Sequence, residues 1–356
     1  MNQHVVFSDF SGNLSGTGAG QFDGDGVEFQ SSTEIIFTPS ITLDNGLTFG
    51  VNVQIEGENA RTIDETFMSI QGDSFGRLDI GSENSAGYKS MVAAPEVTSM
   101  FINSNSLFTL LPLSGAGGVT GPLPTQGLFV GALGSSYTEV AYNNDIDRIS
   151  YYTPNFNGLV VGVSYARNAG VGFNFGNSVG GANNNNIGTV EDIFDIGVNY
   201  SGTIGGVDLN AGARWGTGNS TVVGVSDPET WGIGAQIGFG GFTIGGSYTE
   251  NDQGAVNGAN DQEGWSFGAT FDAPGPWTFE ALTYQGEGTL NSNVTIVAGS
   301  GGNDTSYDAY KIGARRALGP GVNWDIYAVW TEADDEGTIG TDIEATFVGT
   351  AIALSF

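Results

Sequence analysis

Strict alternation of apolar and polar residues is the feature of this sequence that most limits its fold. In one segment the apolar residues stand two apart, at Leu47, Phe49, Val51, Val53 and Ile55. Successive side chains of a β-strand point to opposite faces, so such a segment has one apolar face and one polar face. The same alternation recurs in residues 231–239, 265–271 and 310–314. The pattern predicts an all-β protein.

Alternation and turn residues together divide the chain into sixteen predicted strands. Asn-Gly pairs and clusters of glycine separate many of them, because these residues adopt the positive φ angles that tight reversals need. Most of the strands are close to the ~9 to 11 residues that cross a bilayer at a tilt near ~45°. They are predicted at residues 5–16, 27–38, 47–58, 65–72, 75–82, 147–153, 159–167, 190–200, 206–216, 229–239, 242–250, 263–272, 276–287, 305–317, 321–332 and 341–356.

The connections between these strands alternate between short and long. Long segments rich in Gly, Asn and Asp lie between short reversals centred on Asn45, Asp73, Asn157, Gly205, Gly240, Gly275 and Gly319. Tight turns on one rim and long loops on the other are typical of outer-membrane barrels. We therefore predict a single domain, residues 1–356, that folds as a 16-stranded antiparallel transmembrane β-barrel with short periplasmic turns and long extracellular loops. An even strand number places both chain ends on the short-turn rim.

Aromatic residues stand where the two membrane interfaces are expected. Trp231 and Phe239 are eight residues apart, which is about 26 Å along a strand at ~3.3 Å per residue, so each can lie at one interface. Trp277 and Trp324 flank short turns, and Phe356 ends the alternating apolar stretch FVGTAIALSF. We predict that these five residues anchor the barrel. The last strand is expected to pair with the first, because an unpaired strand edge is not tolerated in lipid.

A soluble β-sandwich or propeller is the alternative fold, since its strands also alternate. In that fold the apolar faces would pack against one another in a dry core. Strand length and the alternation of short and long connections favour the barrel.

The charge of the chain is strongly negative. Its 39 Asp and Glu residues against 9 Lys and Arg give a formal net charge of -30, which argues against nucleic acid as a partner and favours cations. The chain has no cysteine, and its single histidine, His4, is at the terminus, so a thiol nucleophile is excluded and a Ser-His nucleophile is poorly supported. We predict that it is not an enzyme.

Carboxylates are concentrated in two predicted loop segments, FDGDGVE and TEADDEG. Oxygen ligands of this kind are those that Ca²⁺ prefers. Their spacing matches no EF-hand loop, so we assign no metal ligands. Ca²⁺ on loop carboxylates is the one bound ion considered, and no cofactor is predicted.

The longest connection runs from about Glu83 to Asp145, between the fifth and sixth predicted strands. Solvated loops of this length are usually polar, so its apolar side chains need a surface to cover. The barrel interior offers one. These apolar residues include Met91, Val92, Met100, Phe101, Ile102, Leu107, Phe108, Leu110 and Leu111.

Two segments on either side of this connection resemble a known family. FMSIQGDSFGRLDIGSENSA leads into the loop and DRISYYTPNFNGLVVGVSYA leads out of it. Together with the terminal Phe356 they resemble the trimeric sixteen-stranded general-diffusion porins of Gram-negative bacteria, in the alphaproteobacterial form. The resemblance implies an outer-membrane homotrimer, in contact with lipid and lipopolysaccharide, through which small hydrophilic solutes and cations diffuse. It also implies that the third loop, residues 83–145, folds into the barrel and narrows the pore.

The resemblance further implies loop acids set opposite wall bases. The loop acids are Glu83 and Glu96, with Lys89 between them. Strand alternation places bases on the lumen face, exposed to water, because a lipid-facing Arg or Lys costs about 2 to 4 kcal/mol at mid-bilayer; these bases are Arg77, Arg148, Arg214, Lys311 and Arg315. The eight residues form the predicted pore constriction. Alternation also predicts three further acids on the lumen face, Glu34, Glu56 and Glu280.

Bases are scarce compared with the arginine cluster usual in such porins. Acids at the constriction are then expected to concentrate cations. The leading hypothesis is a passive, cation-preferring outer-membrane porin, and the first alternative is a substrate-specific channel, for instance for sugars. A third hypothesis is a non-channel adhesin or a secreted Ca²⁺-dependent β protein. Planar-bilayer conductance separates the three.

Overall fold

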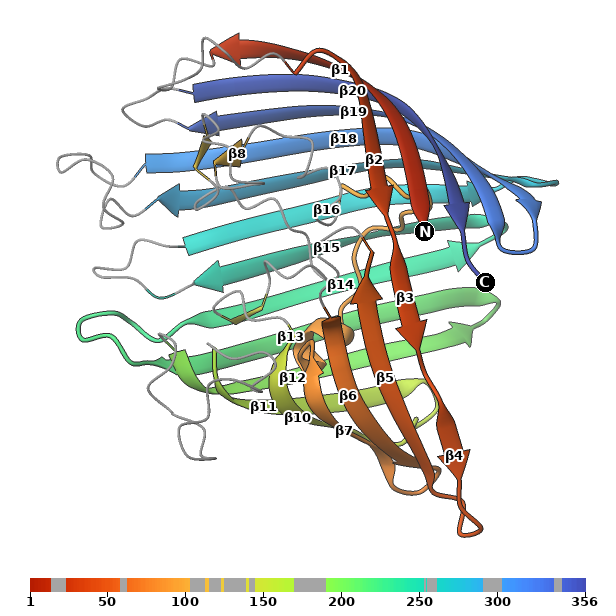
Figure 1. Cartoon of the computed structure of the whole chain (residues 1–356), viewed down its shortest axis with the longest axis vertical. Helices are drawn as coiled ribbons and strands as arrows, with labels where there is room; N and C mark the ends of the chain where they lie inside the picture. Colours follow the sequence, from red (N-terminus) through yellow and green to blue (C-terminus); the bar gives the residue numbers. More distant parts are fainter. Residues whose placement is uncertain are drawn as a thin grey trace.

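The described strands form one barrel-shaped sheet. The computed structural model describes residues 1–13, 24–57, 63–102, 113–114, 123–124, 139–140, 145–169, 190–252, 254, 261–290, 303–335 and 341–356. Within this part, 18 strands are joined into one antiparallel sheet. Figure 1 shows them side by side around the barrel.

The strand bounds follow the predicted ranges closely. They are β1 (Asn2–Asn13), β2 (Gly26–Ser32), β3 (Glu34–Phe37), β4 (Ser40–Thr42), β5 (Thr48–Glu56), β6 (Ile63–Gly72), β7 (Gly76–Glu83), β10 (Ile146–Tyr152), β11 (Leu159–Asn168), β12 (Val190–Ile204), β13 (Val207–Ser220), β14 (Glu229–Phe239), β15 (Phe242–Asp252), β16 (Asp261–Asp272), β17 (Trp277–Leu290), β18 (Asn303–Gly319), β19 (Val322–Asp335) and β20 (Thr341–Leu354).

The third loop, between β7 and β10, has small elements of its own. It contains the four-residue helix α1 (Ala86–Lys89) and a two-stranded parallel sheet of β8 (Leu113–Ser114) and β9 (Leu123–Pro124). In the part of the chain that the structure describes, no helix has the length and apolar character to cross a membrane.

One predicted strand is interrupted. The expectation of a single strand at 27–38 is wrong in detail, because breaks at Thr33 and at residues 38–39 divide this segment into β2, β3 and β4. Pro39 has no N–H to donate to a ladder, although its carbonyl accepts from Val51 N at 3.0 Å. β2 pairs with β1, whereas β3 and β4 pair with β5. The two breaks account for eighteen strands where sixteen are predicted.

The short turns use the predicted residues, and all seven predicted reversals are present. Asn157 and Gly158 have φ angles of 54° and 98°. Two successive positive φ angles give a turn whose twist matches that of the flanking strands. Turn chemistry therefore fixes where the strands reverse on this rim.

β1 and β20 close the barrel. They pair from Asn2 with Ala353 to Asn13 with Asp342, so the predicted pairing of first and last strands is confirmed. Both chain ends lie on the short-turn side (Figure 1). β20 ends at Leu354, and Phe356 lies beyond the strand, fully exposed.

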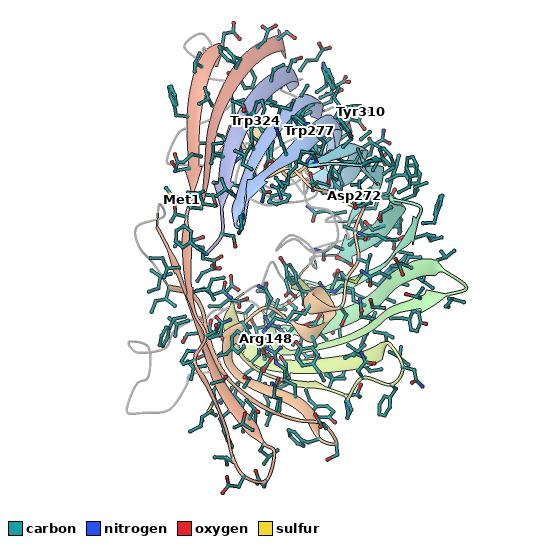
Figure 2. All side chains as sticks on the ribbon, turned by 90° about the vertical axis from the view of Figure 1, so that its right-hand side faces the viewer. Met1, Arg148, Asp272, Trp277, Tyr310 and Trp324 are labelled. Atoms are coloured by element: carbon teal, nitrogen blue, oxygen red, sulfur yellow. The ribbon has the colours of Figure 1, made fainter. Side chains whose placement is uncertain are left out.

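Apolar side chains cover the outside of the barrel. On β14, Ile233 and Ile237 are 54% and 45% exposed while Gly232 is buried, and on β16 Phe267 is exposed while Ser266 is buried. Figure 2, seen from the short-turn side, shows side chains projecting outward around the ring of strands. The apolar faces look outward instead of at each other, as a membrane barrel requires, and this excludes the soluble sandwich.

Aromatic residues form two levels on this outer face. On the long-loop side, the register brings together the pairs Trp215–Trp231, Tyr248–Trp265 and Tyr310–Trp330. On the short-turn side, rings are in contact in the pairs Phe239–Phe242, Phe242–Phe271 and Trp277–Trp324. Two such levels match the aromatic girdles of membrane barrels. That these residues anchor the barrel stays a prediction.

Candidate functional site

The third loop turns into the barrel directly after β7. Ser85 caps helix α1, because its Oγ accepts from Tyr88 N at 3.0 Å. The N–H of Ala86 donates to Ser164 Oγ of β11 at 3.1 Å. Figure 2 shows this helix inside the ring of strands. The predicted inward fold is confirmed for the described part of the loop; outside that part lie four of its predicted apolar residues, Leu107, Phe108, Leu110 and Leu111.

Inward-facing glycines of the wall make room for the loop. A Cβ added at Gly197 of β12 or Gly212 of β13 would lie 2.3 Å from the Oγ or the carbonyl oxygen of Ser90, and one at Gly234 of β14 would lie 1.8 Å from Val92 O. These contacts leave no space for a larger side chain. The loop therefore follows a track of glycines across three neighbouring strands.

Polar side chains of the wall hold the loop backbone along this track. Three contacts do so on β12, β14 and β16: Asn199 Nδ2 to Ser90 O at 3.2 Å, Gln236 Nε2 to Ala93 O at 2.9 Å, and Ala94 N to Ser266 Oγ at 3.1 Å. A buried backbone group without a partner would cost about 1 to 3 kcal/mol. These contacts explain how an irregular segment can lie inside the barrel.

Arg214 on β13 is buried beneath α1. Its Nη2 lies 2.6 Å from Asp195 Oδ1 of β12 and 3.3 Å from Glu139 Oε2 of the third loop. Glu139 Oε1 also accepts from Ser85 N at 2.8 Å. A buried charge without a partner is costly, so the guanidinium and its two carboxylates hold one another in place. Through Glu139 they tie two distant points of the loop to the wall.

Lys89 and Arg77 form ion pairs near the start of the loop. Lys89 Nζ donates to the carboxylate of Glu83 and lies 4.6 Å from the centroid of the Phe67 ring. Arg77 Nε lies 2.7 Å from Asp79 Oδ1, two residues along β7. The ring contact adds a cation-π attraction to the first pair. Each of these two positive charges is offset by a neighbouring carboxylate.

Lys311 on β18 holds the loop on the other side of the barrel. Its Nζ lies 2.5 Å from Glu96 Oε1 of the loop and 3.0 Å from Glu280 Oε1 of β17, and it donates to Met100 O at 2.7 Å. Glu280 Oε2 also accepts from Val97 N at 2.6 Å. Burial raises the pKa of the Glu96 carboxyl, and the Lys311 ammonium opposes that shift. The cluster joins two strands to the loop.

Arg315 on β18 acts on the loop through Asp325 of β19. The Arg315 Nε and Nη2 atoms each lie 2.7 Å from an oxygen of the Asp325 carboxylate, a bidentate geometry that fixes its orientation. Asp325 Oδ2 then accepts from Ser99 N at 2.9 Å and from Ser99 Oγ at 2.8 Å. The base thus positions the acid that binds the loop.

An apolar cluster fills the inside of the barrel on β17 to β20 and β1. Loop residues Ala94, Met100 and Ile102 pack against inner side chains of the wall that include Val6, Tyr284, Tyr307, Tyr327, Val329 and Phe347. His4 Nδ1 lies 2.8 Å from the Tyr327 hydroxyl. The sequence predicts a polar lumen face here. The structure corrects this expectation, because the third loop covers that face and excludes water.

The predicted wall bases lie on the inner face, as Figure 2 shows for Arg148. The expectation that they face water is wrong for three of them, since Arg148, Arg214 and Lys311 are 5%, 4% and 1% exposed. Arg77 and Arg315 are partly exposed. The predicted loop acids Glu83 and Glu96 are in ion pairs with Lys89 and Lys311. The structure divides the eight residues between two clusters, and their part in a constriction stays a prediction.

Sequence reasoning missed three acids that hold the loop. Asp195 stands between Phe194 and Ile196, and Asp325 stands between Trp324 and Ile326. Alternation alone could therefore have placed both on the inner face. Glu139 lies in the third loop, where no periodic pattern identifies it.

No metal centre is seen in the described ranges, where no three Asp, Glu or His side chains are arranged to hold an ion. Of the carboxylates expected to bind Ca²⁺, Asp25 Oδ1 accepts from Phe10 N at 2.8 Å, while Asp23 and Glu336 lie outside the described residues. Ca²⁺ binding stays a prediction.

Several solved structures have the same fold. The outer-membrane channel DcaP of Acinetobacter baumannii has a TM-score of 0.60 at 11% identity, covering 100% of this chain and 95% of that chain. An anion-selective porin from Comamonas acidovorans has a TM-score of 0.57 at 16% identity, and the match covers 99% of each chain. OmpT of Vibrio cholerae, in a trimer form, has a TM-score of 0.59 at 12% identity, and the match covers 98% of this chain and 96% of that chain. No curated protein sequence matches this chain. Likeness at these identities shows the fold.

The family of the chain is shown by its sequence. The sequence model of the Gram-negative porins matches residues 7–338, a span that contains β2 to β19 and the whole third loop. With its outward apolar face and its loop folded against the inner wall, the chain belongs to the Gram-negative porin family and is a channel protein of the outer membrane.

Proposed function

We propose that this porin is a passive diffusion channel for small hydrophilic solutes and ions. The observation that supports this most is the division of its side chains: apolar residues cover the outer face, and the third loop is held against the inner wall by buried ion pairs. A barrel with a fixed internal loop needs no moving part to conduct. Its selectivity then depends on the charges that line the open space.

We propose further that the pore prefers cations. The chain has a formal net charge of -30. Five of its inner bases are offset by neighbouring acids, in the pairs Arg77–Asp79, Lys89–Glu83, Arg214–Asp195, Lys311–Glu96 and Arg315–Asp325. Paired bases contribute little positive potential to the lumen. The excess carboxylates then raise the local concentration of cations.

Planar-bilayer recording tests both proposals. The purified protein is expected to give large, stable conductance steps, with a reversal potential in a KCl gradient that favours K⁺ over Cl⁻. A reversal potential that favours Cl⁻ would contradict the cation preference. Well-folded protein that gives no conductance would contradict the channel itself and favour the adhesin hypothesis.

The sugar-specific alternative requires aromatic side chains along the open lumen. Among the described inner-face residues, Tyr284, Tyr307 and Tyr327 are buried in the apolar cluster. These three tyrosines offer no accessible aromatic track. Tyr152 on the inner face of β10 is partly exposed, but a single ring is not a stripe. A conductance that is blocked by a particular sugar would support this alternative.

The absence of enzymatic activity stays a prediction.

We also propose a homotrimer surrounded by lipid and lipopolysaccharide. The family resemblance supports it, together with exposed apolar side chains on the outer face of β2 to β4, among them Phe29, Ile35, Phe37 and Ile41. Light scattering of the detergent-extracted protein is expected to give the mass of three chains. A monomeric mass in a mild detergent would contradict the proposal.

Ca²⁺ on the long-loop carboxylates is the remaining proposal. If the ion stabilises those loops, a chelator lowers the thermal unfolding midpoint and added Ca²⁺ restores it. A midpoint that does not respond to either would remove the proposal.

A further inference from the structure

The inner face of the barrel has two unlike parts. On β19 and β20 it is apolar and covered, and Val329 and Phe347 are both 0% exposed. On β2 and β3 it is open, because Glu28, Glu34 and Ile36 are all exposed. Water therefore reaches the inner wall at β2 and β3.

Contacts with the third loop identify the inner face of this open part. Gln54 Nε2 on β5 donates to Glu65 Oε2 at 2.7 Å, and Glu65 Oε1 accepts from Asn84 Nδ2 of the third loop at 2.7 Å. Side chains two residues apart on a strand share a face, so Glu56 faces inward with Gln54. Glu34 of β3 lies directly opposite Glu56 in the register and shares that face.

Glu28 lies on the same inner surface, further along the interrupted strand. Its register partner is Val6 of β1, whose side chain is buried in the apolar cluster inside the barrel. Residues 1–60 contain eight acids and no Lys or Arg. The strands of this open part therefore supply no base to offset their carboxylates.

The pairing of Glu34 with Glu56 has an energetic cost. Like charges directly opposite one another on neighbouring strands repel, and their side chains are only about 5 Å apart at Cβ. Nothing in the packing of β3 requires a second acid there, because Glu34 is exposed and Glu56 opposite it is only partly buried. The repulsion is consistent with a role in binding mobile cations.

The acids of the third loop are in the opposite situation. Glu83 is paired with Lys89, and Glu96 is paired with Lys311. The fields of two opposite charges in contact largely cancel at a distance, whereas an unpaired carboxylate attracts cations across the lumen. The loop acids are thus poorly placed to select ions.

We propose that Glu34 and Glu56, with Glu28 further along the wall, give the pore its cation preference. Ions then pass along the inner face of β2, β3 and β5 instead of between the third loop and the wall bases. This inference rests on the proposed channel function and names the residues that determine its selectivity.

The first test combines Glu34→Gln with Glu56→Gln and measures the reversal potential in a KCl gradient. The ratio of K⁺ to Cl⁻ permeability is expected to fall at least about threefold, because two unpaired charges leave the path, while conductance steps persist. The matched control combines Glu263→Gln with Glu287→Gln. These two acids are also opposite in the register and exposed, but they lie on the outer face, so the ratio is expected to stay unchanged.

The second test uses the absence of cysteine from the chain. A Glu34→Cys channel is first recorded and then treated with a cationic methanethiosulfonate reagent. The reagent places a positive charge on the proposed path, so the K⁺ current and the permeability ratio are expected to fall. A Glu287→Cys channel is expected to show neither change. Because the channel conducts before the reagent is added, a folding defect cannot produce the result.

Two outcomes separate this inference from the proposed function. If Glu34→Gln with Glu56→Gln leaves the ratio unchanged while Glu83→Gln with Glu96→Gln lowers it, the inference is overturned and the channel stands. If the unmodified, folded protein gives no conductance, the proposed function fails first.

Discussion

The inner wall at β11 to β19 and the inner wall at β2 to β5 come from the same alternating pattern, but they are built differently. The first is covered by the third loop and consists of glycines, paired charges and buried polar side chains such as Gln236. The second is open and displays unpaired acids such as Glu34 and Glu56. Under the loop a polar group has mainly protein atoms as possible partners, whereas on the open wall water can serve. Coverage by the loop therefore decides whether a lumen-facing charge is paired with another side chain or stays free to attract ions.

Removing the ammonium of Lys311 is expected to have the largest effect on the covered wall. Lys311→Met keeps the apolar stem but leaves Glu96 and Glu280 buried without a counter-charge. Breaking a buried ion pair in this way costs about 3 to 5 kcal/mol, so the free energy of unfolding measured in urea is expected to fall by about that amount. The loop is also expected to shift, raising open-channel noise.

Two comparisons sharpen this prediction. Arg316→Met removes an exposed base whose guanidinium carbon lies 5.5 Å from the Trp277 ring centroid, and it is expected to change stability by less than about 1 kcal/mol. Adding Glu96→Gln to Lys311→Met restores part of the loss, because one unpaired carboxylate disappears. Equal effects of the Lys311 and Arg316 changes would contradict the anchoring role of Lys311.

Filling the glycine track is expected to have the next largest effect. In Gly234→Ala the new Cβ would stand 1.8 Å from Val92 O, so the loop backbone must move, at about 1 to 3 kcal/mol for overpacking. Gly238→Ala is the matched control on the same strand and face, where the nearest atom is Asp208 Cβ at 3.3 Å. Urea unfolding is expected to show a clear loss only for the first variant. A similar loss for both variants would mean that replacing any glycine of this strand lowers the stability, and that the clash with the loop is not the cause.

The strands and turns could be predicted from the sequence because each depends on neighbouring residues. Leu47 to Ile55 alternate within one segment, and Asn157-Gly158 specifies its own reversal. The break in the second strand was harder to predict. Pro39 is a visible signal, but alternation continues past it at Ile41.

The path of the third loop could not be predicted in the same way. Gly234 and Gly212 look like the many other glycines of the chain, and only the folded register shows that they lie on adjacent strands under the loop. Lys311 was correctly assigned to the inner face by its phase. Its burial depends on Glu96, 215 residues away in the sequence, and no local pattern records that contact.

The end of the third loop is expected to respond to pH. Burial and the neighbouring carboxylates of Asp64, Glu65 and Glu139 raise the pKa of Asp145 from its ordinary 3.8 to about 8. A raised carboxyl pKa contributes stability below the ordinary value, and this stability is lost as the pH rises toward the folded value. The unfolding midpoint of the protein is therefore expected to fall between pH 4 and pH 8.

Asp145→Asn isolates this contribution. The amide keeps the shape of the protonated carboxyl but does not titrate, so the variant is expected to have a flatter pH profile over the same range. The effect is smaller than that of a fully buried charge, because Asp145 is partly exposed and solvent screens it. An unchanged profile would show that another group causes the pH dependence.

The smallest expected effect compares two glutamines that each donate a hydrogen bond from the inner wall. Gln236→Ala removes the donor to Ala93 O under the loop, where no protein group replaces it, so the free energy of unfolding is expected to fall by about 1 kcal/mol. Gln54→Ala removes the donor to Glu65, which is buried but keeps Asn84 as a partner. The Gln54 side chain is only partly buried, so water can take the place of the lost amide. Its loss is expected to be under half as large. If the two variants lose equal stability in urea, water does not reach the wall at β5, and the contrast between the covered and open parts fails with it.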